Sequence, residues 1–116
     1  MGQLDRFRLA MADVSAPATP EEIATLLDVC VRQACEALGL LEAEIYCGGG
    51  LVTMFLTPRH AWEAVVIGAD AYRLYPGFIR DGGDTIVWPN VWVAENYSLE
   101  KFVGILEDEL GEAAEA

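Results

Sequence analysis

The chain has 116 residues, 53% of them hydrophobic, and a formal net charge of −12 at pH 7. This length suits a single domain with its own core, and the hydrophobic content excludes a disordered chain. So acidic a surface repels nucleic-acid backbones and anionic membranes but attracts basic proteins. No apolar run reaches the roughly 18 residues that span a bilayer, and the N-terminus lacks a signal-peptide pattern. We therefore expect a cytoplasmic protein.

The negative charge is concentrated in two stretches of the chain. Residues 21–47 carry six acids against Arg32, and residues 81–116 carry nine acids against Lys101. Residues 48–80, between them, have a net charge of +1. Because each acidic stretch contains a predicted helix, we expect the excess charge to lie on helices.

Residues 1–18 are predicted to form an arm, either flexible or docked. Residues 15–18 have a linker composition. The apolar residues before them fit a helical turn or a docked strand equally well: Leu4, Phe7, Leu9 and Met11. We expect the folded domain to cover residues 19–111 and residues 112–116 to form a frayed acidic tail.

The first long helix has the clearest boundaries. Thr19 is a good N-cap, Pro20 suits the first helical position, and Glu22 completes a capping box. Gly39 stands where a left-handed residue ends a helix. The residues between follow the helical period along one apolar stripe: Ile23, Leu26, Leu27, Cys30, Val31, Ala34, Cys35 and Leu38.

Short β-strands separated by glycine and proline turns follow this helix. They are predicted at residues 43–47, 51–57, 61–67, 71–75, 85–88 and 91–94. Residues 48–50, three glycines, are typical of a hairpin turn, and residues 76–84 are expected to be a loop. Pro89 and Asn90 make the last two strands either a hairpin or one bent edge strand.

A second helix is predicted to begin near Ser98, with Leu99, Phe102, Leu106 and Leu110 on its buried side. Short connections favour antiparallel strands, since parallel pairing needs crossover helices that this sequence lacks. We therefore predict an α+β two-layer sandwich. It has an antiparallel sheet of about four to six strands, with an N-terminal and a C-terminal helix on one face.

The sequence contains no catalytic or metal-binding motif. One histidine and three cysteines are present: His60, Cys30, Cys35 and Cys47. They lack the spacing of a zinc site, and we expect the cysteines to be reduced and mostly buried. Asp81 and Asp84 lack the alternating oxygen ligands of a calcium loop. We predict no catalytic residue, no metal and no cofactor.

Two features suggest a surface for binding a partner. The segment Glu107, Asp108 and Glu109 places acids near the predicted end of the last helix, where they oppose its dipole by a few tenths to about 1 kcal/mol each. Tryptophan and tyrosine are enriched at binding hot spots. The predicted contact residues are Glu21, Asp28, Glu36, Trp88, Trp92, Tyr97, Glu107, Asp108 and Glu109.

These observations favour a non-enzymatic inhibitor or neutraliser that blocks a basic, nucleic-acid-handling protein by charge complementarity or DNA mimicry. Immunity proteins, antitoxins and anti-CRISPR or anti-restriction proteins act in this way, and the chain resembles them in size and charge alone. One alternative is a small homodimeric acidic chaperone or adaptor. The other is a small enzyme or ligand-binding domain that uses His60.

Overall fold

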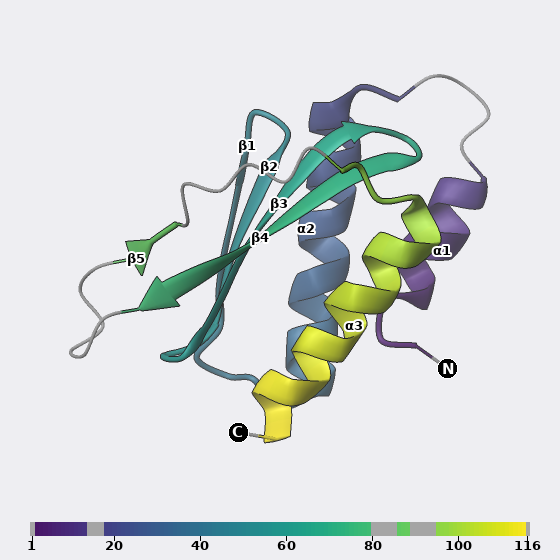
Figure 1. Ribbon diagram of the computed structural model, residues 1–116. Coiled ribbons are helices and arrows are strands. Elements are labelled where there is room, and N and C mark those ends of the chain that lie inside the picture. Colours follow the sequence, from purple (N-terminus) through teal and green to yellow (C-terminus); the bar gives the residue numbers. More distant parts are fainter. Residues whose placement is uncertain (1, 14–17, 80–85, 89–94, 116) are drawn as a thin grey trace.

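A computed structural model describes residues 2–13, 18–79, 86–88 and 95–115, which form three helices and one sheet (Figure 1). The elements in chain order are α1 (Asp5–Ala12), α2 (Pro20–Ala37), β1 (Glu44–Gly48), β2 (Leu51–Thr57), β3 (His60–Gly68), β4 (Ala71–Ile79), β5 (Ile86–Val87) and α3 (Leu99–Glu115). The chain is thus an α+β protein, as the sequence predicts.

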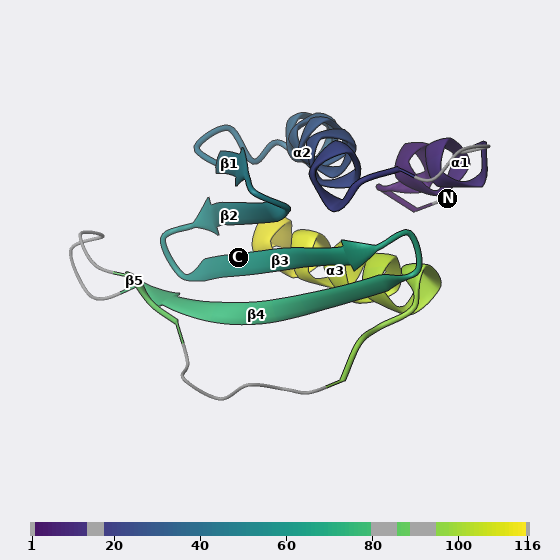
Figure 2. The same cartoon turned by 90° about the horizontal axis from the view of Figure 1, so that it is seen from above.

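The five strands lie side by side in chain order, and every neighbouring pair is antiparallel (Figure 2). Gly48 pairs with Leu51, so the β1–β2 hairpin turns on Gly49 and Gly50. Both glycines have positive φ, 60° and 78°, as a two-residue turn of this kind requires. The predicted glycine hairpin is confirmed.

Strand β4 differs most from the sequence prediction. It continues through Pro76 and Gly77 to Ile79, a segment that we expected to be a loop. The proline is compatible with pairing because antiparallel partners alternate between hydrogen-bonded and non-hydrogen-bonded positions, and the latter need no N–H. The predicted strand at residues 91–94 and the loop residues Asp81 and Asp84 lie outside the described residues.

Helix α2 has the boundaries that its capping signals predict. The Thr19 hydroxyl accepts a hydrogen bond from the Glu22 backbone N–H, and the Glu22 carboxylate accepts one from the Thr19 N–H. Gly39, just beyond the helix, has a φ of 75°. The apolar stripe faces β1, β2 and β3, and Ile23, Leu27 and Val31 are almost fully buried.

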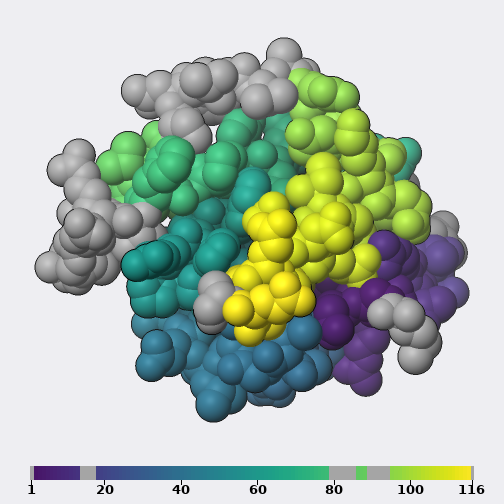
Figure 3. Space-filling view, turned by 60° about the horizontal axis from the view of Figure 1, so that its bottom comes forward, coloured from purple at the N-terminus to yellow at the C-terminus, as the bar shows by residue number. Residues whose placement is uncertain are grey.

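The N-terminal arm is a docked helix, which resolves the two alternatives that the sequence left open. Leu4 and Phe7 are fully buried, and α1 lies against both α2 and α3. Figure 3 shows the purple N-terminal residues directly against the yellow residues of α3. The helix layer therefore has three members where we predicted two.

Helix α3 is longer than predicted. The Ser98 hydroxyl caps it by accepting from the Lys101 N–H, as expected, and Asp70 in the β3–β4 turn accepts from the Leu99 N–H at 2.8 Å. At the other end the chain does not fray after Gly111: the helix continues to Glu115, and Ala113 is buried. Packing of Ala113 on the core stabilises the turn that its sequence alone leaves weak.

The core lies between the helix layer and one side of the sheet. Tyr72 of β4 and Phe102 of α3 stack with their ring centroids 4.6 Å apart, and Phe7 of α1 meets the same tyrosine edge-on at 6.3 Å. All three side chains are fully buried. Tyr72 thus joins both terminal helices to the sheet.

Candidate protein-binding surface

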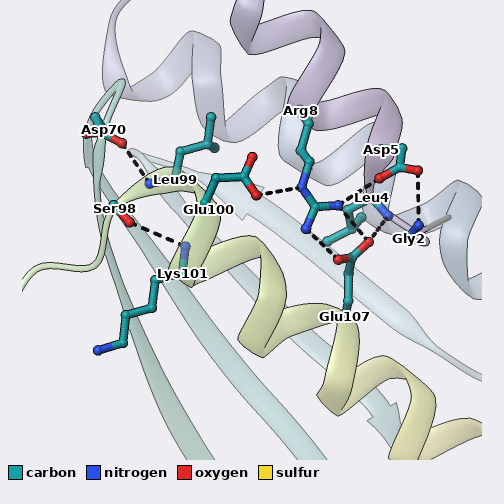
Figure 4. A network of polar contacts seen from close by, with 10 residues as sticks. All are labelled: Gly2, Leu4, Asp5, Arg8, Asp70, Ser98, Leu99, Glu100, Lys101 and Glu107. Atoms are coloured by element: carbon teal, nitrogen blue, oxygen red, sulfur yellow. Dashed lines mark hydrogen bonds and ion pairs between the residues drawn. The ribbon is translucent and has the colours of Figure 1, made fainter.

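Glu107, central to the predicted acidic cluster, is used inside the fold. Its carboxylate lies 2.7 Å from Arg8 of α1 and accepts a hydrogen bond from the Leu4 backbone N–H at 2.9 Å (Figure 4). Arg8 also pairs with Asp5 and Glu100. Only 14% of the Glu107 side chain is exposed. Hydrogen bonding to Glu107 is the main reason that the pKa of Arg8 lies above its ordinary value. The Glu107 carboxylate of α3 thus holds α1 in place through Arg8 and Leu4.

The two neighbours of Glu107 have different surroundings. Asp108 is exposed, whereas Glu109 is half-buried on the side of α3 that faces the sheet. Burial and the nearby charge of Glu112 raise the pKa of Glu109, although hydrogen bonding from Trp62 acts in the opposite direction. Because α3 extends to Glu115, all three acids lie in mid-helix, and the dipole argument applies to Glu112 and Glu115 instead.

The predicted contact residues of α2 are spread along the helix. Glu21 is exposed in its first turn, a full helix length from Glu36, which is exposed in its last turn. Asp28, between them, forms an ion pair with Arg32 at 3.0 Å, and 16% of its side chain is exposed. Arg32 also donates to the backbone oxygen of Ile45, so it shields the free edge of β1.

Of the predicted aromatic contact residues, the structure describes Trp88 and Tyr97, both of which lie against β4. The ring of Trp88 lies across Gly77, so close that a Cβ atom there would be 2.5 Å from it. Tyr97 forms an isolated antiparallel bridge with Tyr72, and its ring lies 5.2 Å from the Lys101 ammonium nitrogen. Trp92 lies outside the described residues. The predicted contact residues that the structure describes are thus spread over α2, α3 and the strand β4.

The structure instead brings together the C-terminal ends of α2 and α3. Residues 39–42 after α2 and residues 113–114 of α3 line one shallow depression of about 270 Å³. Figure 3, which shows the molecule from its lower end, has the yellow end of α3 beside blue residues of the α2 region. Exposed carboxylates surround this junction, which we call the acidic end: Glu36, Glu42, Glu112 and Glu115.

The two helix dipoles add to the negative potential at the acidic end. A helix C-terminus is equivalent to roughly half a negative charge, and cationic side chains normally offset it. Neither α2 nor α3 has a basic residue in its last turn. The exposed Arg59 beside Pro58, which lines the same depression, is a cation at this border. Carboxylates and dipoles of one sign therefore converge here.

An apolar side chain projects from the middle of the acidic end. Leu41 is 87% exposed, the highest value among the large hydrophobic residues that the structure describes. It lines two depressions, the one shared with α3 and a second of about 290 Å³ beside Cys35 and Ile45. A protruding leucine ringed by carboxylates is an arrangement that a partner with basic groups and an apolar pocket can bind.

The histidine and two of the cysteines take part in a turn and in the core. His60 Nδ1 lies 2.8 Å from the Thr57 hydroxyl, which also accepts from the Arg59 backbone N–H and so belongs to the β2–β3 turn. Cys30 and Cys35 are free and buried, and burial raises the pKa of the Cys35 thiol to about 11. No cluster of His, Cys, Asp and Glu among these residues is suited to a metal ion.

Sequence reasoning missed Leu41 and Glu42 and undervalued the end of α3. The available signal was the pair Leu40 and Leu41 directly after Gly39, since a tight connection buries one of two adjacent leucines more easily than both. Leu40 is partly buried against the core. Which leucine projects, and what lies near it, depends on where α3 ends.

Comparison with known proteins gives no identification. No protein-family model, no curated protein and no solved structure matches this chain. Among the described residues, no helix has the length and hydrophobicity to cross a membrane. The function has to be argued from the surface itself.

Proposed function

We propose that this protein is a non-enzymatic, cytoplasmic binding module that inhibits or neutralises a basic, nucleic-acid-handling protein by charge complementarity. Immunity proteins, antitoxins and anti-CRISPR or anti-restriction proteins are the corresponding functional classes. The observation that carries the proposal is the acidic end, where four exposed carboxylates and two helices without a basic residue in the last turn lie close to the exposed Leu41.

The physics of such a surface favours a cationic partner. Opposite potentials accelerate encounter and exclude partners of the wrong charge, while a buried apolar anchor supplies much of the affinity. Leu41 provides the anchor, and the surrounding carboxylates take the place that phosphates occupy in the partner's cationic groove. Three free cysteines fit the reducing conditions of the cytoplasm.

The test uses the whole chain as bait in an extract of its native host. A variant with Glu36, Glu112 and Glu115 replaced by lysine should lose the partner that the unmodified chain retains. A matched variant with Asp13, Glu21 and Glu95 replaced by lysine has the same net charge and should keep it, because these acids are exposed away from the acidic end. If both variants lost the partner equally, binding would depend on net charge alone, and the proposed site would be wrong.

The captured partner then allows two sharper measurements. Its affinity should fall at least roughly tenfold between about 50 and 300 mM salt, because screening weakens attraction between exposed charges. Leu41→Ser should weaken binding at both salt concentrations alike, since it removes an apolar contact. An affinity that is indifferent to salt, or a partner without a basic surface, would contradict the proposal.

A further inference from the structure

Strand β4 becomes progressively more exposed along its helix side. Successive residues of a strand point to opposite sides of the sheet, so every second residue of β4 faces the helices. Along this side Tyr72 is fully buried, Leu74 is 8% exposed, Pro76 is exposed and Phe78 is 64% exposed. Figure 1 shows the end of β4 running away from α3. The helices that the structure describes thus cover only the first half of this strand.

Four neighbouring side chains form an apolar surface at this end of the sheet. Trp62 is paired with Pro76, and Val87 is paired with Phe78, so the four lie together on the helix side. Val87 is 40% exposed, and Trp62 is partly buried against the core. The ring of Trp88 contacts β4 from the outer side. We call these four residues the apolar shelf: Trp62, Pro76, Phe78 and Val87.

The flank of α3 that borders the shelf is acidic. Ile105, Glu109 and Glu112 share this flank because they are spaced by four and by three residues. The Glu109 carboxylate accepts a hydrogen bond from the Trp62 side chain, which places the flank beside the shelf. Glu109 is half-buried, and Glu112 is exposed. Two carboxylates therefore lie along one border of an apolar surface.

This border favours a cation. Burial and the charge of Glu112 raise the pKa of Glu109, and the Trp62 hydrogen bond and the charge of His60 do not outweigh them. The negative charge of Glu109 is thus unfavourable where it lies, so a cationic group brought to the border would stabilise it. A second copy of this chain, with a charge of −12, would be repelled.

A segment that covers the shelf has to satisfy its own backbone. The face of a sheet presents side chains, because the strands bond to one another within the sheet. An extended segment laid on that face would therefore leave its N–H and C=O groups unpaired. A helix bonds these groups internally and packs on a sheet face, as α3 does on the neighbouring part of β4. The element that fits is an amphipathic helix.

We infer that the apolar shelf binds a basic amphipathic helix of the partner, in the position next to α3. The inference rests on the proposed function, because the partner is the same cationic protein, and it names the element that this partner contributes. Apolar side chains of the helix pack on Trp62, Phe78 and Val87. Its lysine or arginine side chains, three or four residues apart, face Glu109 and Glu112, which have the same spacing on α3. Glu112 also belongs to the acidic end, so the two surfaces adjoin.

Two designed peptides of about 14 residues, roughly four helical turns, test the inference. One has leucine at helical spacing and lysine elsewhere, and the other has the same residues in an order without an apolar face. NMR titration with up to about 1 mM peptide measures both Kd values. The amphipathic peptide should bind at least roughly tenfold more tightly and should shift the indole N–H signal of Trp62. Equal affinities would mean attraction by net charge alone and would overturn the inference.

Matched serine variants locate the apolar contact. Phe78→Ser should weaken binding of the amphipathic peptide by at least roughly tenfold, because it removes the largest exposed side chain of the shelf. Leu9→Ser, at a residue of α1 that is 67% exposed, should leave this affinity unchanged. Neither variant should lower the urea midpoint, since both side chains are exposed. A lower midpoint for Phe78→Ser alone would mean that the chain itself covers the shelf, and the inference would be wrong.

Matched charge variants locate the border. Glu109→Gln combined with Glu112→Gln should weaken binding of the amphipathic peptide by at least roughly threefold. Asp13→Asn combined with Glu21→Gln changes the net charge equally, away from the shelf, and should weaken it less. Equal effects of the two pairs would contradict a contact at the border.

The peptide measurements do not depend on a partner from the native host. If the peptide affinity is indifferent to Phe78→Ser while the captured partner still depends on the acidic end, the inference fails and the proposed function stands. If no basic partner is captured, the proposed function fails, whatever the affinity of the peptide.

Discussion

The helix side and the outer side of the sheet have different compositions and different charges. On the helix side, Val52, Met54 and Leu56 are at most 1% exposed beneath the helices, and the negative charge lies one layer further out on α2 and α3. On the outer side, the alternate residues of β2 remain partly exposed, with few charges around them. The same sheet thus separates the acidic surface of the helices from a side on which apolar residues of β2 are partly exposed. Acidic groups are therefore exposed mainly on the helix side, and apolar side chains of β2 on the outer side of the sheet.

The largest difference between the two sides is expected for leucine substitutions at matched positions of β2. Leu56→Ala on the helix side removes a 1% exposed side chain and should lower the free energy of unfolding by about 3 kcal/mol. Leu51→Ala makes the same chemical change on the outer side, where the side chain is 38% exposed, and should cost less than about 1 kcal/mol. Urea unfolding monitored by circular dichroism measures both. Equal losses would mean that Leu51, on the outer side of the sheet, is covered in the monomer.

Two adjacent acids of α3 should differ in their effect on stability. Glu107→Gln weakens the pairing with Arg8 and should cost about 2 kcal/mol, because hydrogen bonds to charged groups are worth about that much. Asp108→Asn alters an exposed acid and should stay within about 0.5 kcal/mol of the unmodified chain. The measurement is again the urea midpoint at constant slope. If Glu107→Gln left the free energy of unfolding unchanged, α1 would be held by its apolar contacts alone.

The smallest expected effect is a pH dependence at Glu109. Burial raises the pKa of this acid in the folded state, so the folded chain holds its proton more tightly than the unfolded chain. Its contribution to stability is therefore largest below the ordinary carboxyl pKa and is lost as the pH rises through the folded-state value. Glu109→Gln should raise the melting temperature at pH 7 and lose that advantage near about pH 4.

The control for this effect is Glu112→Gln, whose carboxylate is exposed on the same helix. It removes one of the charges that raise the pKa of Glu109 and should therefore give a smaller gain of the same sign. A Glu109→Gln gain that is constant across this pH range would show that the ionised Glu109 carboxylate is not its cause.

Features that depend on residues close together in the chain could be predicted from the sequence. The capping box at Thr19 and Glu22, the glycine turn at Gly49 and Gly50, and the cap at Ser98 are short-range hydrogen-bonding and backbone preferences. The apolar periods of α2 and α3 and the short strand connections then gave the α+β class. They also gave the helix layer on one side of the sheet.

Long-range packing sets which carboxylates are exposed, and the sequence does not reveal it. Glu107 and Arg8 are 99 residues apart, and nothing local distinguishes Glu107 from the exposed Asp108 beside it. The acidic end depends on where two helices finish relative to each other, and Leu41 projects there because the chain turns between them. A carboxylate is structural or available according to what lies within a few ångströms of it, and long-range packing alone sets those distances.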